Sequence, residues 1–114
     1  MKTFNRMAAQ GDVMIVAIAA IPAAAVLAKA DGRYHVIAHS ETGHHHVVEC
    51  DGVDVLNDPD DAFRSFLRVT LAGGAVIEHQ RSFDTHEPLL VPPGDYEIRR
   101  QREYVPEGFR RAGD

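Results

Sequence analysis

Cysteine is almost missing from this sequence: the chain has a single one, Cys50, and it contains no tryptophan. A lone cysteine cannot form a disulfide within its own chain. Because there is no second cysteine, the sequence also contains no Cys-x-x-Cys redox or metal pair. Nothing in the sequence therefore requires an oxidising compartment, and we expect a cytoplasmic location.

Basic residues are also scarce, because 12 Lys and Arg stand against 17 Asp and Glu, which gives a net charge of −5. Non-specific binding of nucleic acid depends on neutralising phosphates, so we expect no nucleic-acid partner. The charges are unevenly distributed, with an acidic stretch at 51–61 and an arginine-rich stretch at 99–111. We interpret both stretches as solvated surface. Gly-rich phosphate loops and nucleophile elbows are absent from the sequence, which disfavours nucleotide chemistry.

Long hydrophobic runs are missing too, since the longest, Met14 to Ala28, contains Pro22 and is shorter than the roughly 20 residues of a membrane span. We expect no membrane partner. The run is similar to a secretory signal with a cleavage site near Ala30. Asp12, just before the run, and Pro22, inside it, argue against that interpretation. We favour a buried strand at 12–18 with two apolar faces, then a turn and an Ala-rich connection, with a short helix at 23–30 as an alternative.

The 114 residues match the size of one domain, 1–114. Beyond Asp31 the chain shows short segments of alternating polarity separated by turn residues, which predicts strands. We expect a mainly β protein with little helix, a small barrel or sandwich of seven to eight short strands. Strands are expected at 34–39, 44–50, 53–56, 66–71, 75–79, 89–91 and 96–105. Asp51-Gly52 predicts a hairpin, and residues 57–61 predict a loop.

Histidines provide the most specific chemical signal, because five of the seven fall between His35 and His46. If 44–50 is extended, His44 and His46 share one face, and two such imidazoles can bind one metal ion. We expect His86 to be the third ligand, with His79 in reserve and Glu49 as a further candidate. Three nitrogen ligands suit Zn²⁺, whereas an added Glu49 or Glu87 suits iron or manganese.

Two alternatives to a metal site stay open. The histidines can simply pack, form hydrogen bonds or titrate near pH ~6.5. Cys50 can be paired with His44 or His46 as a nucleophile, although a single cysteine at a strand end is more commonly a small buried side chain. No catalytic residues follow from this pattern, so the sequence does not decide whether the protein is an enzyme.

Four motifs give a resemblance to known proteins: Thr42-Gly43-His44-His45-His46, Thr85-His86-Glu87-Pro88, Pro92-Pro93-Gly94-Asp95-Tyr96 and Gln101-Arg102-Glu103-Tyr104. Together they resemble a family of uncharacterised small bacterial and prophage-associated proteins with TGHxH, PPGxY and QREY motifs. The resemblance covers most of the chain from Gly11 onward, and it implies that the apolar run at 11–18 belongs to the fold. It implies no activity.

A second, partial resemblance is to cupins, in which HxH and Glu on one strand and a PxG turn on another surround a metal. His44, His46 and Glu49 are similar to the first motif, and Pro92-Pro93-Gly94 is similar to the second. The gap from His46 to Glu49 is shorter than in cupins, and Glu97 occupies the position of the second motif's histidine.

Three functions follow, in order of preference. The first is a metal-binding β-domain without assigned catalysis, which holds zinc or another divalent transition metal. The second is a structural or interaction protein, either a homo-oligomer or a component of a larger assembly such as a phage particle, in which case its location is the virion. The third is a small cupin-like metalloenzyme.

Overall fold

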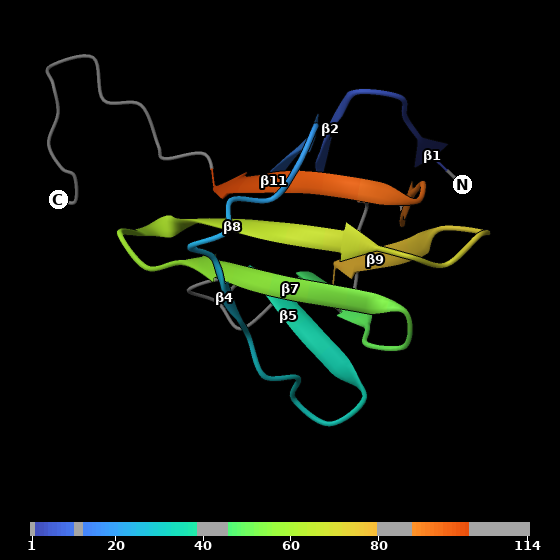
Figure 1. Cartoon of the computed structure of the whole chain (residues 1–114). Coiled ribbons are helices and arrows are strands. Elements are labelled where there is room, and N and C mark those ends of the chain that lie inside the picture. Colours follow the sequence, from blue (N-terminus) through green and yellow to red (C-terminus); the bar gives the residue numbers. More distant parts are fainter. Residues whose placement is uncertain (1, 11–12, 39–45, 80–87, 101–114) are drawn as a thin grey trace, which may run out of the picture.

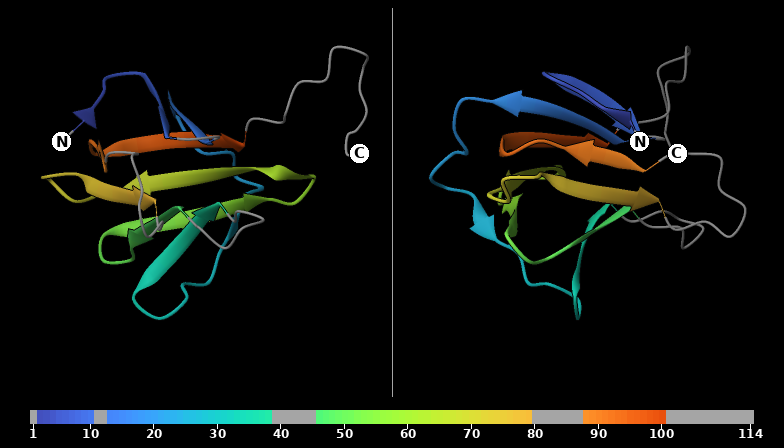
Figure 2. Two further views of the ribbon diagram at one scale, coloured as in Figure 1. Left: turned by 180° about the vertical axis from the view of Figure 1, so that it is seen from behind. Right: turned by 90° about the vertical axis from the view of Figure 1, so that its right-hand side faces the viewer.

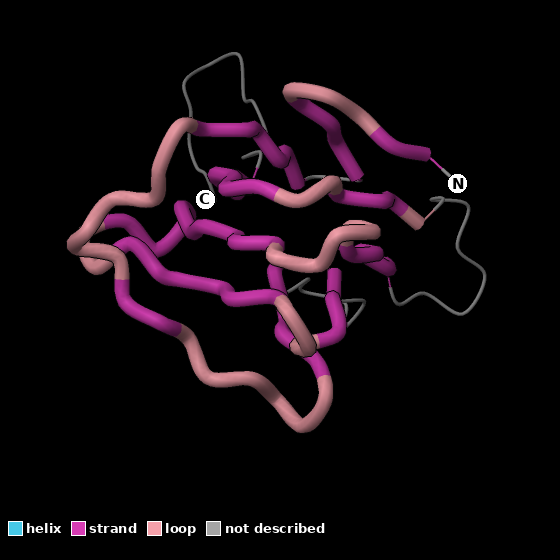
Figure 3. The backbone as a smooth tube through the Cα atoms, turned by 45° about the vertical axis from the view of Figure 1, so that its right-hand side comes forward, coloured by secondary structure: helices cyan, strands magenta, loops and turns pink. Residues whose placement is uncertain are grey.

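The computed structural model describes residues 2–10, 13–38, 46–79 and 88–100, and in these ranges it contains strands and turns but no helix (Figures 1 and 3). Eleven strands are described: β1 (Lys2–Thr3), β2 (Met7–Gln10), β3 (Val13–Ile18), β4 (Val26–Leu27), β5 (Tyr34–Ala38), β6 (His46–Glu49), β7 (Val53–Asp58), β8 (Asp61–Val69), β9 (Ala75–His79), β10 (Leu89–Val91) and β11 (Gly94–Arg100). The predicted mainly β class is confirmed.

The strands form two sheets that pack against each other (Figure 2). The five-stranded sheet has the order β1-β10-β9-β6-β5, and the six-stranded sheet has the order β2-β3-β11-β8-β7-β4. Both sheets contribute side chains to one hydrophobic core, among them Val48 and Ile77 from the first sheet and Ile15, Leu67 and Ile98 from the second. Of the two predicted architectures the protein adopts the sandwich, not the closed barrel.

The apolar N-terminal run is part of the fold, as the family resemblance implied. β3 lies between β2 and β11, and Val13 and Ile15 are completely buried. The outer face of β3 is only half-buried and Ala17 is exposed, so the prediction of two fully covered faces is wrong. The alternative of a helix at 23–30 is also wrong, because Val26 and Leu27 pair with β7 as an edge strand. None of the described residues forms a helix that is long and apolar enough to cross a membrane.

Two turns that were recognised in the sequence connect different sheets. Asp51-Gly52 is a turn, and Gly52 has a φ of 70°, a conformation that favours glycine. The strands on either side do not form the predicted hairpin, since β6 pairs with β5 and β9 whereas β7 pairs with β8 and β4. Likewise, Pro92-Pro93 leads from β10 in one sheet to β11 in the other. A short turn between consecutive strands can therefore connect the two sheets of a sandwich.

Three short strands and one hairpin were not expected from the sequence. β1, β2 and β4 lie at sheet edges and consist of two to four residues each. The predicted loop at 57–61 is instead a hairpin between β7 and β8, with a turn only at residues 59–60. Asp58 accepts a hydrogen bond from the backbone N–H of Asp60 at 2.8 Å, which stabilises the turn locally.

Candidate metal-binding site

Two of the histidines lie opposite each other on neighbouring strands. The register of β6 against β9 pairs His46 with His79, and both strands are interior strands of the five-stranded sheet. His46 is 1% exposed and is two residues from Val48, a core residue, so it lies on the inner face of the sheet. The sequence analysis treated His79 as a reserve ligand, and the register places it directly opposite His46.

Most of the other histidines of the chain belong to the segments that adjoin these strands in the sequence. Residues 39–45 connect the end of β5 to His46, and residues 80–87 follow His79. The predicted ligands His44 and His86 belong to these two segments and lie outside the described residues. His35 is on β5 itself. Seven histidines are therefore carried by three adjacent strands and the two segments attached to them.

Glu49 lies on the other face of the same sheet. It is three residues from His46 on a regular strand, which places the two side chains on opposite faces, and it is exposed. Its side chain helps line a cleft of about 410 Å³ on the outer face of the sheet, together with Tyr34, Val47, Val76 and Glu78. The structure does not bring Glu49 together with His46.

His35 is a candidate that the sequence reasoning missed. Its side chain is 7% exposed, and its Nε2 lies 3.1 Å from the carbonyl oxygen of Val53 on the opposite sheet. Its Nδ1 is buried and has no hydrogen-bond partner among the described residues. The contact joins residues 18 positions apart on different sheets, so no local sequence pattern could have revealed it.

The remaining sequence hypotheses find less support in this geometry. Among the side chains that the structure describes, which do not include that of His79, no three His, Cys, Asp or Glu residues come together as a metal-binding group. Cys50 follows β6, so about 13 Å of extended chain separates it from His46. This distance rules out the proposed cysteine–histidine pair with His46.

The two cupin-like motifs are far apart in the fold. The Pro92-Pro93-Gly94 turn follows Val91, which pairs with Ala75 at the start of β9. His46 pairs with His79 at the other end of the same strand, about 13 Å away at the usual rise per residue. In a cupin these two motifs surround one metal, so the structure does not support the cupin-like interpretation.

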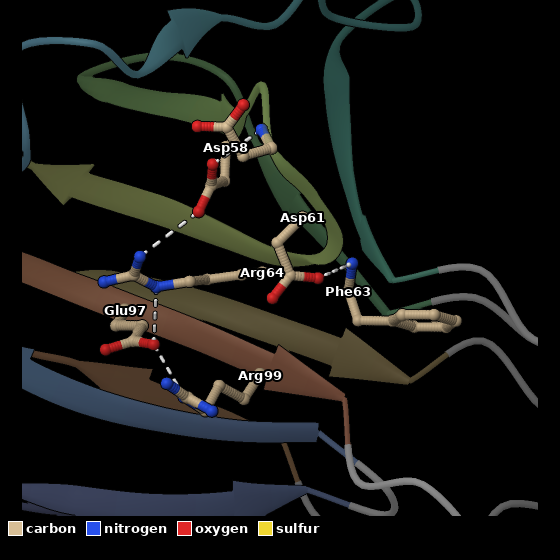
Figure 4. A network of polar contacts seen from close by, with 7 residues as sticks. Asp58, Asp61, Phe63, Arg64, Glu97 and Arg99 are labelled. Carbon is tan, nitrogen blue, oxygen red and sulfur yellow. Dashed lines mark hydrogen bonds and ion pairs between the residues drawn. The ribbon is translucent and has the colours of Figure 1, made fainter.

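A network of charged side chains lies elsewhere, on the outer face of the six-stranded sheet (Figure 4). Arg64 donates to Glu97 at 2.8 Å and to Asp58 at 3.2 Å, and Glu97 also accepts from Arg99 at 2.6 Å. The hydrogen bond to Glu97 is the main reason that the pKa of Arg64 is raised above its ordinary value, with Asp58 adding to it. Each carboxylate in this network has a basic partner, which is the arrangement expected of a structural surface cluster.

Comparison with known proteins identifies a family for this chain. No curated protein and no solved structure matches this chain. A family described as a domain of unknown function, DUF8820, matches residues 9–101, which include every strand from β3 to β11. The chain therefore belongs to the DUF8820 family.

Proposed function

We propose that this protein binds a divalent transition metal ion, most simply Zn²⁺, at the histidine-bearing end of its five-stranded sheet. The observation that carries the proposal is the register pairing of His46 with His79. Directly opposed residues of antiparallel strands have Cβ atoms about 4.5–5.5 Å apart on one face of the sheet. Two imidazoles at that spacing can both reach one ion at the usual Zn–N distance of about 2.0–2.1 Å.

The sequence offers further nitrogen ligands a few residues away from this pair along the chain. His44 precedes His46 by two residues and His86 follows His79 by seven, and both remain predicted ligands. Glu49 is on the other face of the sheet, and Glu87 lies outside the described residues. The ligands proposed here are therefore neutral imidazoles, which favours zinc over an iron or manganese site with mixed ligands. The proposed role is metal binding without assigned catalysis.

Zinc titration of untagged protein tests the proposal. We expect binding of about one zinc ion per chain, and we expect His46→Gln and His79→Gln each to weaken it at least about tenfold, because each removes a ligand. Isothermal titration calorimetry measures the affinity, and circular dichroism checks that each variant is folded.

Glu49→Gln is the matched control for this titration. It lies on the same strand as His46 but is exposed on the outer face, so its zinc affinity should equal that of the unsubstituted protein. A chain that binds no zinc, or a glutamate variant that loses as much affinity as the histidine variants, would overturn the proposal.

A second candidate function is that of a structural component of a larger assembly, for which the sequence resemblance suggests a phage particle. It is favoured by the exposed apolar side chains on both edges of the six-stranded sheet. Val26 and Leu27 on β4 are 55% and 63% exposed, and Met7 on β2 is 58% exposed. Edge strands with exposed apolar side chains tend to pair with another chain.

Sedimentation velocity distinguishes this second function. If β4 is an association edge, the chain should sediment as an oligomer, and Leu27→Lys should shift it toward the monomer, because a charged edge residue opposes strand pairing. Leu71→Lys, at a residue that is 40% exposed outside the edge strands, is the control and should leave the oligomer intact. A monomer at all concentrations would contradict this function.

A further inference from the structure

His35 is held in one tautomer by the opposite sheet. The carbonyl oxygen of Val53 can only accept a hydrogen bond, so Nε2 of His35, 3.1 Å away, must carry the hydrogen. In the neutral ring Nδ1 then keeps a free electron pair. This is the form of imidazole that binds a metal ion.

The free nitrogen needs a partner. Nδ1 is buried and accepts no hydrogen bond from any residue that the structure describes, and the side chain as a whole is 7% exposed. Nearly all buried polar atoms in proteins have a partner, and the exceptions are commonly explained by a water molecule, an ion or a function. An electron-pair donor in this position can be satisfied by a cation.

The register places His35 beside the proposed metal site. β5 is the strand next to β6, with His35 opposite Val48 and, after a register shift between Val36 and Ala38, Ala38 opposite His46. His35 and Ile37 are buried on the inner face, as are Val48 and His46. His35 and His46 are therefore diagonal neighbours, for which the expected separation is about 7–8 Å.

We propose that His35 is a further ligand of the metal ion, through Nδ1, and this inference rests on the proposed function. Histidines that bind metals commonly donate their other ring N–H to a backbone carbonyl, which fixes the ring and makes it a better ligand. The hydrogen bond to Val53 is of this kind, and it means that both sheets of the sandwich hold the site. His35 and His46 are then ligands that come from adjacent strands and are buried between the two sheets.

Long-range ¹H–¹⁵N NMR of the histidine rings in the full chain tests the inference directly, with zinc chloride as the probe. Before zinc is added, His35 should show a protonated Nε2 and an unprotonated Nδ1. On addition of zinc, the Nδ1 signal should move to the position typical of a metal-bound nitrogen. His35→Gln identifies the signal, because that variant lacks it.

The outcomes separate the inference from the function on which it rests. If zinc shifts the rings of His46 and His79 but leaves Nδ1 of His35 unchanged, the inference is wrong and the proposed metal binding stands. If no ring responds to zinc, both are wrong. In His35→Gln, which keeps a donor for the Val53 carbonyl, we expect a loss of zinc affinity of about tenfold to a hundredfold. Should that variant not fold, the NMR measurement on the unsubstituted chain still decides the question.

Discussion

Phe66→Ala is expected to lower the free energy of unfolding by about 3 kcal/mol, at the low end of the range for a buried phenylalanine. Phe66 is 1% exposed, yet it alternates with the core residue Leu67 and so lies on the outer face of the six-stranded sheet. Its ring is covered by the guanidinium of Arg64, 4.9 Å from the ring centroid. Removing the ring takes away both its own contacts and the surface on which that guanidinium lies.

The position of Arg64 explains how an aromatic ring can be buried on a solvent-facing sheet. Glu97, the cross-strand partner of Phe66, accepts a hydrogen bond from Arg64, and Asp58 accepts a second one (Figure 4). These two carboxylates hold the guanidinium over the ring. The polar network therefore completes a small apolar cluster that includes Leu56, the partner of Phe66 on β7.

Phe63→Ala is the matched control for this prediction. Phe63 is the same residue type on the same strand, and the guanidinium of Arg100 lies 5.8 Å from its ring centroid. It is nevertheless 43% exposed, so its loss should change the free energy of unfolding by about 0.5 kcal/mol or little more. Urea denaturation followed by circular dichroism gives both values. Equal losses in the two variants would contradict the prediction that the buried ring of Phe66 contributes more to stability than the exposed ring of Phe63.

The local features of the fold could be predicted from the sequence. Alternating and β-branched segments predicted strands such as Val13–Ile18, Ala75–His79 and Leu89–Val91, because side-chain alternation reports burial directly. Glycines marked the turns, since Gly52 and Gly74 have φ values of 70° and 84° that other residues rarely adopt. These signals are contained in a few consecutive residues.

The pairing of the strands could not be predicted in the same way. A turn such as Asp51-Gly52 shows that the chain reverses, but the same turn serves a hairpin or a crossing between sheets. β2 and β4 are Ala-rich or very short, and they are strands because a neighbouring strand offers free hydrogen-bonding groups. Their sequences alone carry little preference for a strand.

The same difference between local sequence signals and tertiary pairing applies to the residues of the candidate site. The histidine-rich segment identified His46 because the spacing of residues along a strand is local. The closeness of His79 depends on the register of β6 against β9, and the importance of His35 depends on a carbonyl from the other sheet. Both are consequences of tertiary structure, so the sequence could only include His79 in a broader set and gave no reason to select His35.

Gly74→Ala is expected to lower the free energy of unfolding by about 2 kcal/mol or more. Gly74 has a φ of +84°, and a Cβ atom added to it would lie 2.6 Å from the carbonyl oxygen of Val91. The atom it meets belongs to the backbone of β10, which pairs with β9 through Val91 and Ala75. Relief of the contact therefore requires two paired strands to move apart.

Two other glycines separate the causes of this loss. Gly32 has a φ of +64° but open space around it, so Gly32→Ala should show only the conformational strain, about 1 kcal/mol. Gly73, the neighbour of Gly74, has open space and no positive φ, so Gly73→Ala should lie within about 0.5 kcal/mol of the unsubstituted protein. Urea denaturation of the three variants gives their free energies of unfolding and therefore the order of the three losses. If Gly74→Ala loses no more than Gly32→Ala, the contact with Val91 is relieved without cost and the strain at φ alone explains why glycine is needed at residue 74.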